Sequence, residues 1–124
     1  MGGWLLWRRL EAQSGLAAVQ RRGVLRVGLD PSFPPFETLD AGGQVIGLDA
    51  DIARAIAADL GVQVEFVPIA FDGLYDALQV GRVDVLLSGL PVDPTRTRDV
   101  AYSRPYFNAG QMLVTTRPDV QSVG

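Results

Sequence analysis

The sequence predicts an α/β domain in which a mostly parallel sheet is flanked by helices. From Gly23 onward, short apolar runs rich in β-branched residues alternate with stretches whose apolar residues recur at helical spacing. The order strand, helix, strand, helix, strand favours parallel pairing through right-handed crossovers. The chain has 124 residues, of which 48% are apolar and 20% charged, and this suffices for one globular core.

Three strands and one long helix are expected in the first half of this domain. They span residues 24–29, 36–39, 44–46 and 48–60. The second and third strands flank a turn-forming cluster at 40–43, so we expect them to pair as a hairpin. The helix is the clearest element, because Ile52, Ile56 and Leu60 recur every four residues. Gly61 is expected to end it, as glycine commonly does just after a last helical turn.

The second half is expected to continue the alternation. Its predicted elements are a strand at 62–68, a helix at 71–80, a strand at 83–87, a short helix capped by Asp93 with Pro94 at its first position, and a last strand at 111–116. The longer helix should turn Leu74, Ala77 and Leu78 inward and stop at Gly81. The strand that follows it is apolar except for Asp84, which suits a buried parallel strand.

Residues 1–22 differ from the rest of the chain. The apolar group at 4–7 is too short for the core of a signal peptide, and the arginines next to it follow it instead of preceding it. Two interpretations stay open. The segment is either the remnant of an export or anchor segment, or an amphipathic helix from Leu5 to about Gln20.

The composition excludes several classes of function. Without cysteine or histidine the chain cannot build a disulfide, a thiolate metal site, a serine–histidine triad or a zinc-hydrolase helix. Lysine is absent as well, which excludes a Schiff base and a Walker-type phosphate loop. The 11 arginines are scattered, so we expect no nucleic-acid partner, and we expect neither a cofactor nor a metal. The longest apolar runs have about six residues, where a membrane span needs ~20.

Three loops leave predicted strand ends, at 30–36, 68–72 and 88–91. In parallel α/β sheets, ligands bind beyond the carboxyl ends of the strands, and the topology brings these three loops to one such edge. The candidate ligand-binding residues there are Asp30, Phe33, Phe71, Ser88, Gly89, Leu90 and Arg96.

These candidates suit a small polar solute that carries a carboxylate. Asp30 offers a negative charge, and Phe33 and Phe71 offer aromatic walls. The loop after the third strand adds a hydroxyl and backbone groups, and Arg96 could grip a carboxylate in bidentate fashion. Each residue type also has a structural interpretation, as a turn aspartate, a core phenylalanine or an arginine within a solvated charge cluster.

Four stretches resemble the amino-terminal lobe of periplasmic solute-binding proteins of the polar amino-acid type. They are GVLRVGLDPSFPPFE (23–37), GGQVIGLDADIARAIAADLG (42–61), FDGLYDALQVGRVDVLLSGLPVDPTR (71–96) and YSRPYF (102–107). The resemblance implies one lobe of a type II periplasmic-binding-protein-like fold, truncated at the hinge, because family members carry a whole second lobe. It divides the chain into an N-terminal segment at 1–22, the lobe at 23–117 and the start of a connection at 118–124.

The resemblance also implies a role for most candidates. It gives a carboxylate facing the ligand side chain at Asp30, aromatic walls at Phe33 and Phe71, main-chain contacts at Ser88 and Gly89, and a clamp for the α-carboxylate at Arg96. One position departs from the family pattern. Pro91 stands where the family usually has threonine or serine, so a hydroxyl and an amide donor are missing.

The implied function is that of the substrate-binding component of an ABC-type amino-acid importer. The protein would be periplasmic or extracellular, with or without a membrane anchor in the parent protein, and would meet the transporter membrane subunits and a second lobe. One alternative is a cyclohexadienyl or arogenate dehydratase-like enzyme with Asp30 or Glu37 as general acid, which is disfavoured because nearby Arg96 would lower the pKa of a carboxyl. The others are the sensory domain of a membrane receptor and an isolated half without complete activity.

Half of a two-lobed clamp is expected to bind its ligand weakly or not at all. The ligand would stay solvated on one side, so electrostatic contacts would act in a high dielectric and would not offset the entropic cost of capture. A free strand edge at 111–116 is also expected to favour self-association.

Overall fold

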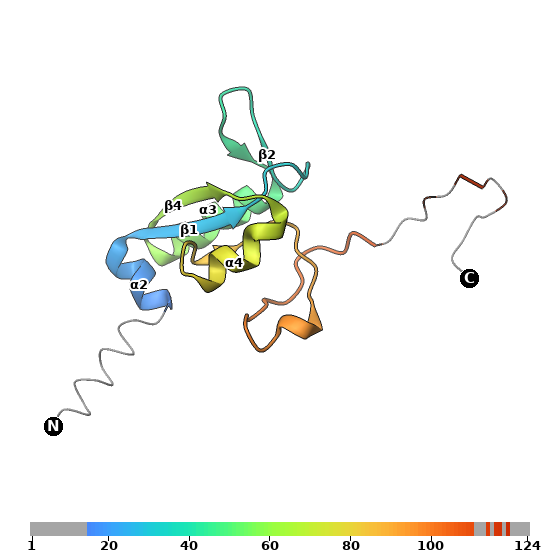
Figure 1. Ribbon diagram of the computed structural model, residues 1–124. Coiled ribbons are helices and arrows are strands. Elements are labelled where there is room, and N and C mark those ends of the chain that lie inside the picture. Colours follow the sequence, from blue (N-terminus) through green and yellow to red (C-terminus); the bar gives the residue numbers. More distant parts are fainter. Residues whose placement is uncertain (1–14, 111–113, 115, 118, 120–124) are drawn as a thin grey trace. The chain divides into compact units, whose positions relative to one another are not determined.

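The computed structural model describes residues 15–110, 114, 116–117 and 119 (Figure 1). The chain divides into two compact units, one ending at Pro91 and one beginning at Val92. The first unit contains every strand and α-helix of the described residues, and the second contains one short 3-10 helix.

The sheet of the first unit has three parallel strands in the order β4-β1-β5, namely Gln63–Pro68, Val24–Leu29 and Val85–Leu86. β1 lies in the centre and pairs with all six residues of β4, from Val24 opposite Gln63 to Leu29 opposite Pro68. β5 pairs with β1 only at two positions, Val85 and Leu86. The predicted parallel sheet is therefore confirmed, but the strand expected at 83–87 is shorter.

The core lies between β1 and the helix α3 (Leu48–Leu60), while α4 (Leu74–Gln79) lies on the other side of the sheet (Figure 1). Every second residue of β1, namely Leu25, Val27 and Leu29, is buried in this core. α2 (Gly15–Arg22) adds Val19 to the same core.

α3 has the bounds that its periodicity predicts. Gly61 follows it in the left-handed conformation, with φ 69°, as expected for a residue that ends a helix. The packed face differs from the isoleucine repeat, because three alanines are buried while 37% of Ile56 is exposed. The buried alanines are Ala50, Ala53 and Ala57.

The helix expected at 71–80 is divided into a 3-10 turn, η1 (Phe71–Gly73), and α4. Leu74 and Ala77 are buried as predicted, and Leu78 is half-buried. The expected hairpin is present as β2 (Thr38–Leu39) paired antiparallel with β3 (Val45–Ile46).

The elements predicted at the two ends of the chain lie only partly within the described residues. The helix predicted over 5–20 is seen from Gly15 and continues to Arg22, and the residues before it lie outside the described part. The strand predicted at 111–116 lies largely outside it too, and the two described positions in that range are not in a strand. None of the described helices is long and apolar enough to cross a membrane.

The second unit contains the predicted short helix as η2 (Pro94–Arg96). Asp93 caps it, since its Oδ1 accepts a hydrogen bond of 2.9 Å from the backbone N–H of Thr95. This bond and the proline at the first helical position agree with the sequence prediction.

Asp84 joins β1, β5 and α2 through a network of hydrogen bonds. Its carboxylate accepts bonds from the backbone N–H of Arg26 (2.8 Å), from the guanidinium of Arg26 (2.9 Å) and from Arg22. Burial acts to raise the pKa of Asp84, but these hydrogen bonds outweigh it and hold the pKa below its usual value. The group is therefore a paired, largely buried charge.

We expect Asp84→Ala to lower the free energy of unfolding by about 3 kcal/mol, because it leaves Arg26 without its carboxylate partner. Asp84→Asn should cost less, since the amide oxygen can still accept from the backbone N–H of Arg26. Urea denaturation of the three proteins measures both effects. A loss below about 0.5 kcal/mol for the alanine variant, typical of an exposed ion pair, would contradict this role.

Candidate functional site

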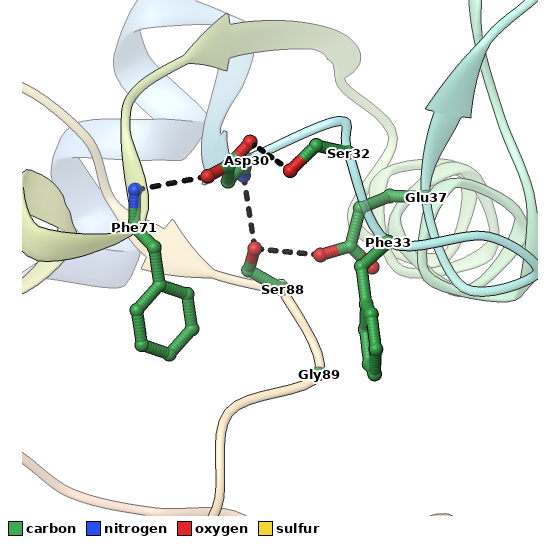
Figure 2. Close-up of a pocket in the computed structure, with 7 residues that line it drawn as sticks. All are labelled: Asp30, Ser32, Phe33, Glu37, Phe71, Ser88 and Gly89. Carbon is green, nitrogen blue, oxygen red and sulfur yellow. Dashed lines mark hydrogen bonds between the residues drawn. The ribbon is translucent and has the colours of Figure 1, made fainter.

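A cavity of about 340 Å³ lies at the edge of the sheet formed by the carboxyl ends of its strands (Figure 2). Its described lining residues are Asp30, Ser32, Phe33, Glu37, Phe71, Ser88 and Gly89. They come from the loops that follow β1, β4 and β5, as the predicted topology requires. The volume is near the lower end of the range for ligand pockets, which suits a small solute.

Five of the seven predicted ligand-binding residues line this cavity. The other two are Leu90 and Arg96. Leu90 is half-buried next to Gly89 and is not among the lining residues. Arg96 belongs to the second unit, where it ends η2 and forms an ion pair of 3.5 Å with Asp93. Its role as a carboxylate clamp therefore stays a prediction.

The two phenylalanines of the cavity are not core residues. The exposed fraction is 51% for Phe33 and 50% for Phe71, too much for side chains that serve only packing. Figure 2 shows the two rings on either side of Ser88 and Gly89, with open space between them. Phe33 is held by the ring of Phe36, on which it stacks at a centroid distance of 5.3 Å.

The loop after β1 is folded so that Phe33 lies at the surface and Glu37 lies inside. The two residues exchange backbone hydrogen bonds, from Phe33 N–H to the Glu37 carbonyl (2.9 Å) and from Glu37 N–H to the Phe33 carbonyl (3.0 Å). These bonds close a tight turn, which gives the phenylalanine wall a defined position at the cavity.

Asp30 contributes a half-buried carboxyl group to the cavity, between Phe71 and Ser32 (Figure 2). Its Oδ2 accepts a bond of 3.0 Å from the backbone N–H of Phe71, and its Oδ1 accepts a bond of 2.7 Å from the hydroxyl of Ser32. A carboxylate oxygen can accept more than one hydrogen bond, so Asp30 retains acceptor capacity toward a ligand. It also fixes the start of η1, and with it the Phe71 wall.

Ser88 and Gly89 are held from inside the protein. The Ser88 hydroxyl accepts a bond from the Asp30 N–H (2.9 Å) and donates one to Glu37 Oε1 (2.6 Å), and only 2% of the residue is exposed. The Gly89 N–H donates to Asp49 Oδ2 at 2.8 Å. The hydroxyl proton of Ser88 is thus used within the protein, and the predicted contacts of this turn with a ligand stay a prediction.

Two buried acids at the cavity were not predicted to bind the ligand. Glu37 and Asp49 are both 0% exposed. The pKa of Glu37 is raised to about 8, mainly because the group is buried. Its hydrogen bond with Asp49 and the negative charges of Asp49 and Asp30 raise the pKa further, whereas the hydrogen bond from Ser88 lowers it. The sequence predicts a role for Glu37 only in the dehydratase alternative, as a general acid. Asp49 lies in the first turn of a helix, where an acidic residue is normally solvated, so no local pattern indicates its burial.

Within the described ranges, no group of three or more acidic side chains could hold a metal ion. The lining of the cavity provides two carboxyl groups, from Asp30 and Glu37, together with the rings of Phe33 and Phe71. The hydroxyls of Ser32 and Ser88 and the backbone groups of Gly89 complete it. Carboxyl groups and aromatic rings in one cavity can contact both the polar and the apolar parts of an organic solute.

A model of the bacterial extracellular solute-binding proteins, family 3, matches residues 25–121. The chain belongs to this family. An L-arginine-binding protein from Pseudomonas aeruginosa is 36% identical to it over 90 residues, which are 73% of this chain and 35% of that protein. Other curated relatives are named as histidine- and arginine-binding periplasmic proteins. The family member described here spans about two fifths of the length of the curated relatives it matches.

Solved structures agree with this assignment. An ancestral cationic amino-acid solute-binding protein, AncCDT-1, has a TM-score of 0.73 and 46% identity, over 76% of this chain and 41% of that one. Domain 1 of the T. maritima protein TmArgBP, crystallised in its arginine-bound form, has a TM-score of 0.72 and 44% identity, over 75% of this chain and 74% of that domain. The predicted resemblance and the one-lobe α/β fold are confirmed.

Proposed function

We propose that this family member is the first lobe of the substrate-binding component of an ABC-type importer, and that its ligand is a cationic amino acid such as arginine. The observation that carries the proposal is that Asp30 and two half-exposed phenylalanine rings line the same small cavity. A guanidinium fits between two aromatic faces, which attract a cation, and donates charge-assisted hydrogen bonds to a carboxylate.

The charge of the cavity favours a cation over a neutral side chain. Asp30 is half-buried, and no basic side chain is among the described residues that line the cavity. A cationic ligand compensates the negative charge, whereas a neutral side chain partly desolvates Asp30 without compensation. The names of the arginine-binding relatives support the same ligand class.

We assign the α-carboxylate of the ligand to Arg96, which follows the Ser88–Gly89 turn in the chain and ends η2. Its guanidinium would provide a bidentate grip that is independent of the ligand's side chain. Pro91 lacks an N–H, so it cannot supply the donor that the family usually has there. The carboxylate contact of Arg96 therefore carries a larger share of the affinity in this proposal.

The arginine-bound domain 1 of TmArgBP argues against the expectation that half a clamp cannot hold its ligand. That domain was crystallised with arginine bound. We propose that this chain likewise binds arginine with one lobe, because Asp30, both aromatic walls and the Ser88–Gly89 turn all lie in one compact unit. Self-association through the segment at 111–116 stays a prediction.

The proposed location is periplasmic or extracellular, as the family description and the names of the periplasmic relatives support. The transporter membrane subunits and a second lobe are the proposed partners, and a membrane anchor in the parent protein is left open. The division into a segment at 1–22, a lobe at 23–117 and a connection at 118–124 belongs to this proposal.

Calorimetry of the chain with L-arginine and agmatine tests both ends of the proposed ligand, because agmatine keeps the guanidinium and lacks the carboxylate. We expect a dissociation constant for arginine below about 1 mM, which corresponds to a favourable binding free energy of at least roughly 4 kcal/mol. Arg96→Ala should weaken arginine binding by about 2 kcal/mol, or ~30-fold, and leave agmatine binding unchanged.

Arg98→Ala is the matched control, because it removes an exposed arginine from the same segment. It should change neither ligand's affinity. The absence of arginine binding to the unaltered chain at 1 mM would refute the single-lobe proposal. An equal effect of the Arg96 and Arg98 variants would refute the clamp.

A dehydratase activity is the second candidate, because one of its conditions is met. The raised pKa of Glu37 would keep this acid protonated at neutral pH. AncCDT-1 is moreover described as a precursor of cyclohexadienyl dehydratase. Glu37 is, however, fully buried and bonded to Ser88 and Asp49, so its proton is directed into the protein. We therefore prefer a binding protein without enzymatic activity, and turnover of prephenate or arogenate would overturn that preference.

A further inference from the structure

Two buried carboxyl groups, those of Glu37 and Asp49, lie together at the wall of the cavity. Glu37 follows the loop after β1, and Asp49 lies in the first turn of α3. The charged groups that act on Glu37 are Asp49 and Asp30, and both are acids. Its remaining partner is the neutral hydroxyl of Ser88. Within the described residues, no basic group is among those that act on Glu37.

The two oxygens of the Glu37 carboxyl have different partners. Oε1 accepts the Ser88 hydroxyl at 2.6 Å, whereas Oε2 is buried and has no donor facing it. Two ionised carboxylates in contact would repel each other strongly at such a site. A single proton resolves this conflict, because a protonated Glu37 can donate to Asp49, whose Oδ2 also accepts from the Gly89 N–H.

Each acid of the pair holds one residue of the turn that borders the cavity. Glu37 accepts from Ser88, and Asp49 accepts from Gly89 at 2.8 Å. Ser88 in turn accepts from the Asp30 backbone at 2.9 Å. The two acids therefore hold the turn from inside the protein, and Figure 2 shows the part of this network that joins Glu37, Ser88 and Asp30.

We propose that Glu37 and Asp49 share one proton, that this proton positions the Ser88–Gly89 turn, and that its loss at alkaline pH loosens the turn and opens the site. Neither acid is assigned a contact with the ligand, so both are positioning residues. The effect on ligand affinity rests on the proposed function, whereas the shared proton does not.

The backbone amide signal of Gly89 reports on this proton directly, because its N–H donates to Asp49. In ¹⁵N–¹H spectra recorded without ligand from pH 6 to 9.5, we expect this signal to titrate with a midpoint near 8. Glu37→Gln keeps a donor toward Asp49 and cannot ionise, so the titration should vanish. The amide of Gly61, at the far end of α3, is the internal control and should not titrate with this midpoint.

Two results would overturn the shared proton: a Gly89 signal that does not titrate between pH 6 and 9.5, or an unchanged midpoint in Glu37→Gln. If the glutamine variant does not fold, Asp49→Asn replaces it. The asparagine still accepts from Gly89 and removes a negative charge beside Glu37, so the midpoint should move to lower pH. A midpoint that stays near 8 in this variant would equally refute the pair.

Stability gives a second readout with a defined sign. The pKa of Glu37 is about 8 in the folded chain and near 4.5 when unperturbed, so between these values the folded state binds a proton that the unfolded state has lost. The stabilisation is fully present below about pH 4.5 and is lost as the pH rises through 8. The urea midpoint should fall across this window, and Glu37→Gln should remove that slope.

A parallel titration with arginine separates this inference from the proposed function. Raising the pH from 6.5 to 9 should weaken arginine binding to the unaltered chain. This loss should be about tenfold larger than the loss in the Glu37→Gln variant. A titrating Gly89 signal without arginine binding would refute the proposed ligand and leave the pair intact. Arginine binding with a pH-independent Gly89 signal would refute the pair and leave the ligand assignment intact.

Discussion

Gly47→Ala is expected to lower the free energy of unfolding by at least about 3 kcal/mol. Gly47 has φ 122° and ψ −177°, a backbone conformation that is essentially restricted to glycine. A Cβ at this position would lie 2.3 Å from the carbonyl oxygen of Phe36 and 2.8 Å from that of Pro35. Both contacts are with backbone atoms, so no side-chain rotation can relieve them.

The backbone around Gly47 cannot move away without loss, because it fixes the start of α3. The Leu48 N–H donates to the Pro35 carbonyl at 3.2 Å, and the Asp49 N–H donates to the Phe36 carbonyl at 2.9 Å. These bonds also bring Asp49 beside Glu37, so the same substitution should disturb the ligand site as well as the fold.

Gly61→Ala is the matched control at the other end of α3. Gly61 also has a positive φ, 69°, but a Cβ there meets nothing within 4 Å. Alanine there only disfavours the left-handed backbone conformation, which should lower the free energy of unfolding by about 1 kcal/mol. Chemical denaturation of both variants measures the difference. Equal costs would show that the contacts with Pro35 and Phe36 relax and that the proposed steric conflict is wrong.

Local patterns predicted the elements whose residues repeat regularly. The period of four in α3 and the alternation in β4 gave bounds that agree with the structure to within one residue. The strand before Ser88 is shorter than its apolar run, because β5 pairs with β1 at only two positions. The sequence did not predict which face of α3 is buried. Ile56 is partly exposed and the alanines are buried because of where the sheet packs against the helix, and the local sequence does not contain that information.

The topology predicted those residues of the candidate site that directly follow the ends of the parallel strands. Asp30, Phe71 and Ser88 come shortly after β1, β4 and β5, so parallel pairing was enough to place them together. Glu37 and Asp49 could not be found in this way. Both are acids in polar local contexts, and their burial depends on how the loop after β1 folds against α3.

Asp30→Asn is expected to weaken arginine binding by about 2–3 kcal/mol, or roughly 30- to 150-fold, because a charge-assisted hydrogen bond to the guanidinium becomes a neutral one. The asparagine should preserve the structure of the site. Its amide oxygen can accept from the Phe71 N–H, and its NH₂ can donate to the Ser32 hydroxyl, the two groups that Asp30 binds. The loss would therefore report on charge and not on a displaced Phe71 wall.

Citrulline provides the matched ligand, since its neutral ureido group has the shape of the guanidinium. Its affinity for the unaltered chain should already be lower than that of arginine, and Asp30→Asn should change it by less than about threefold, or ~0.7 kcal/mol. Calorimetry of the two proteins with the two ligands completes a cycle that isolates the charge interaction. An equal loss for arginine and citrulline would show that Asp30 acts only by holding Phe71 and Ser32 in place, and the assignment of Asp30 to the ligand's cationic group would then be wrong.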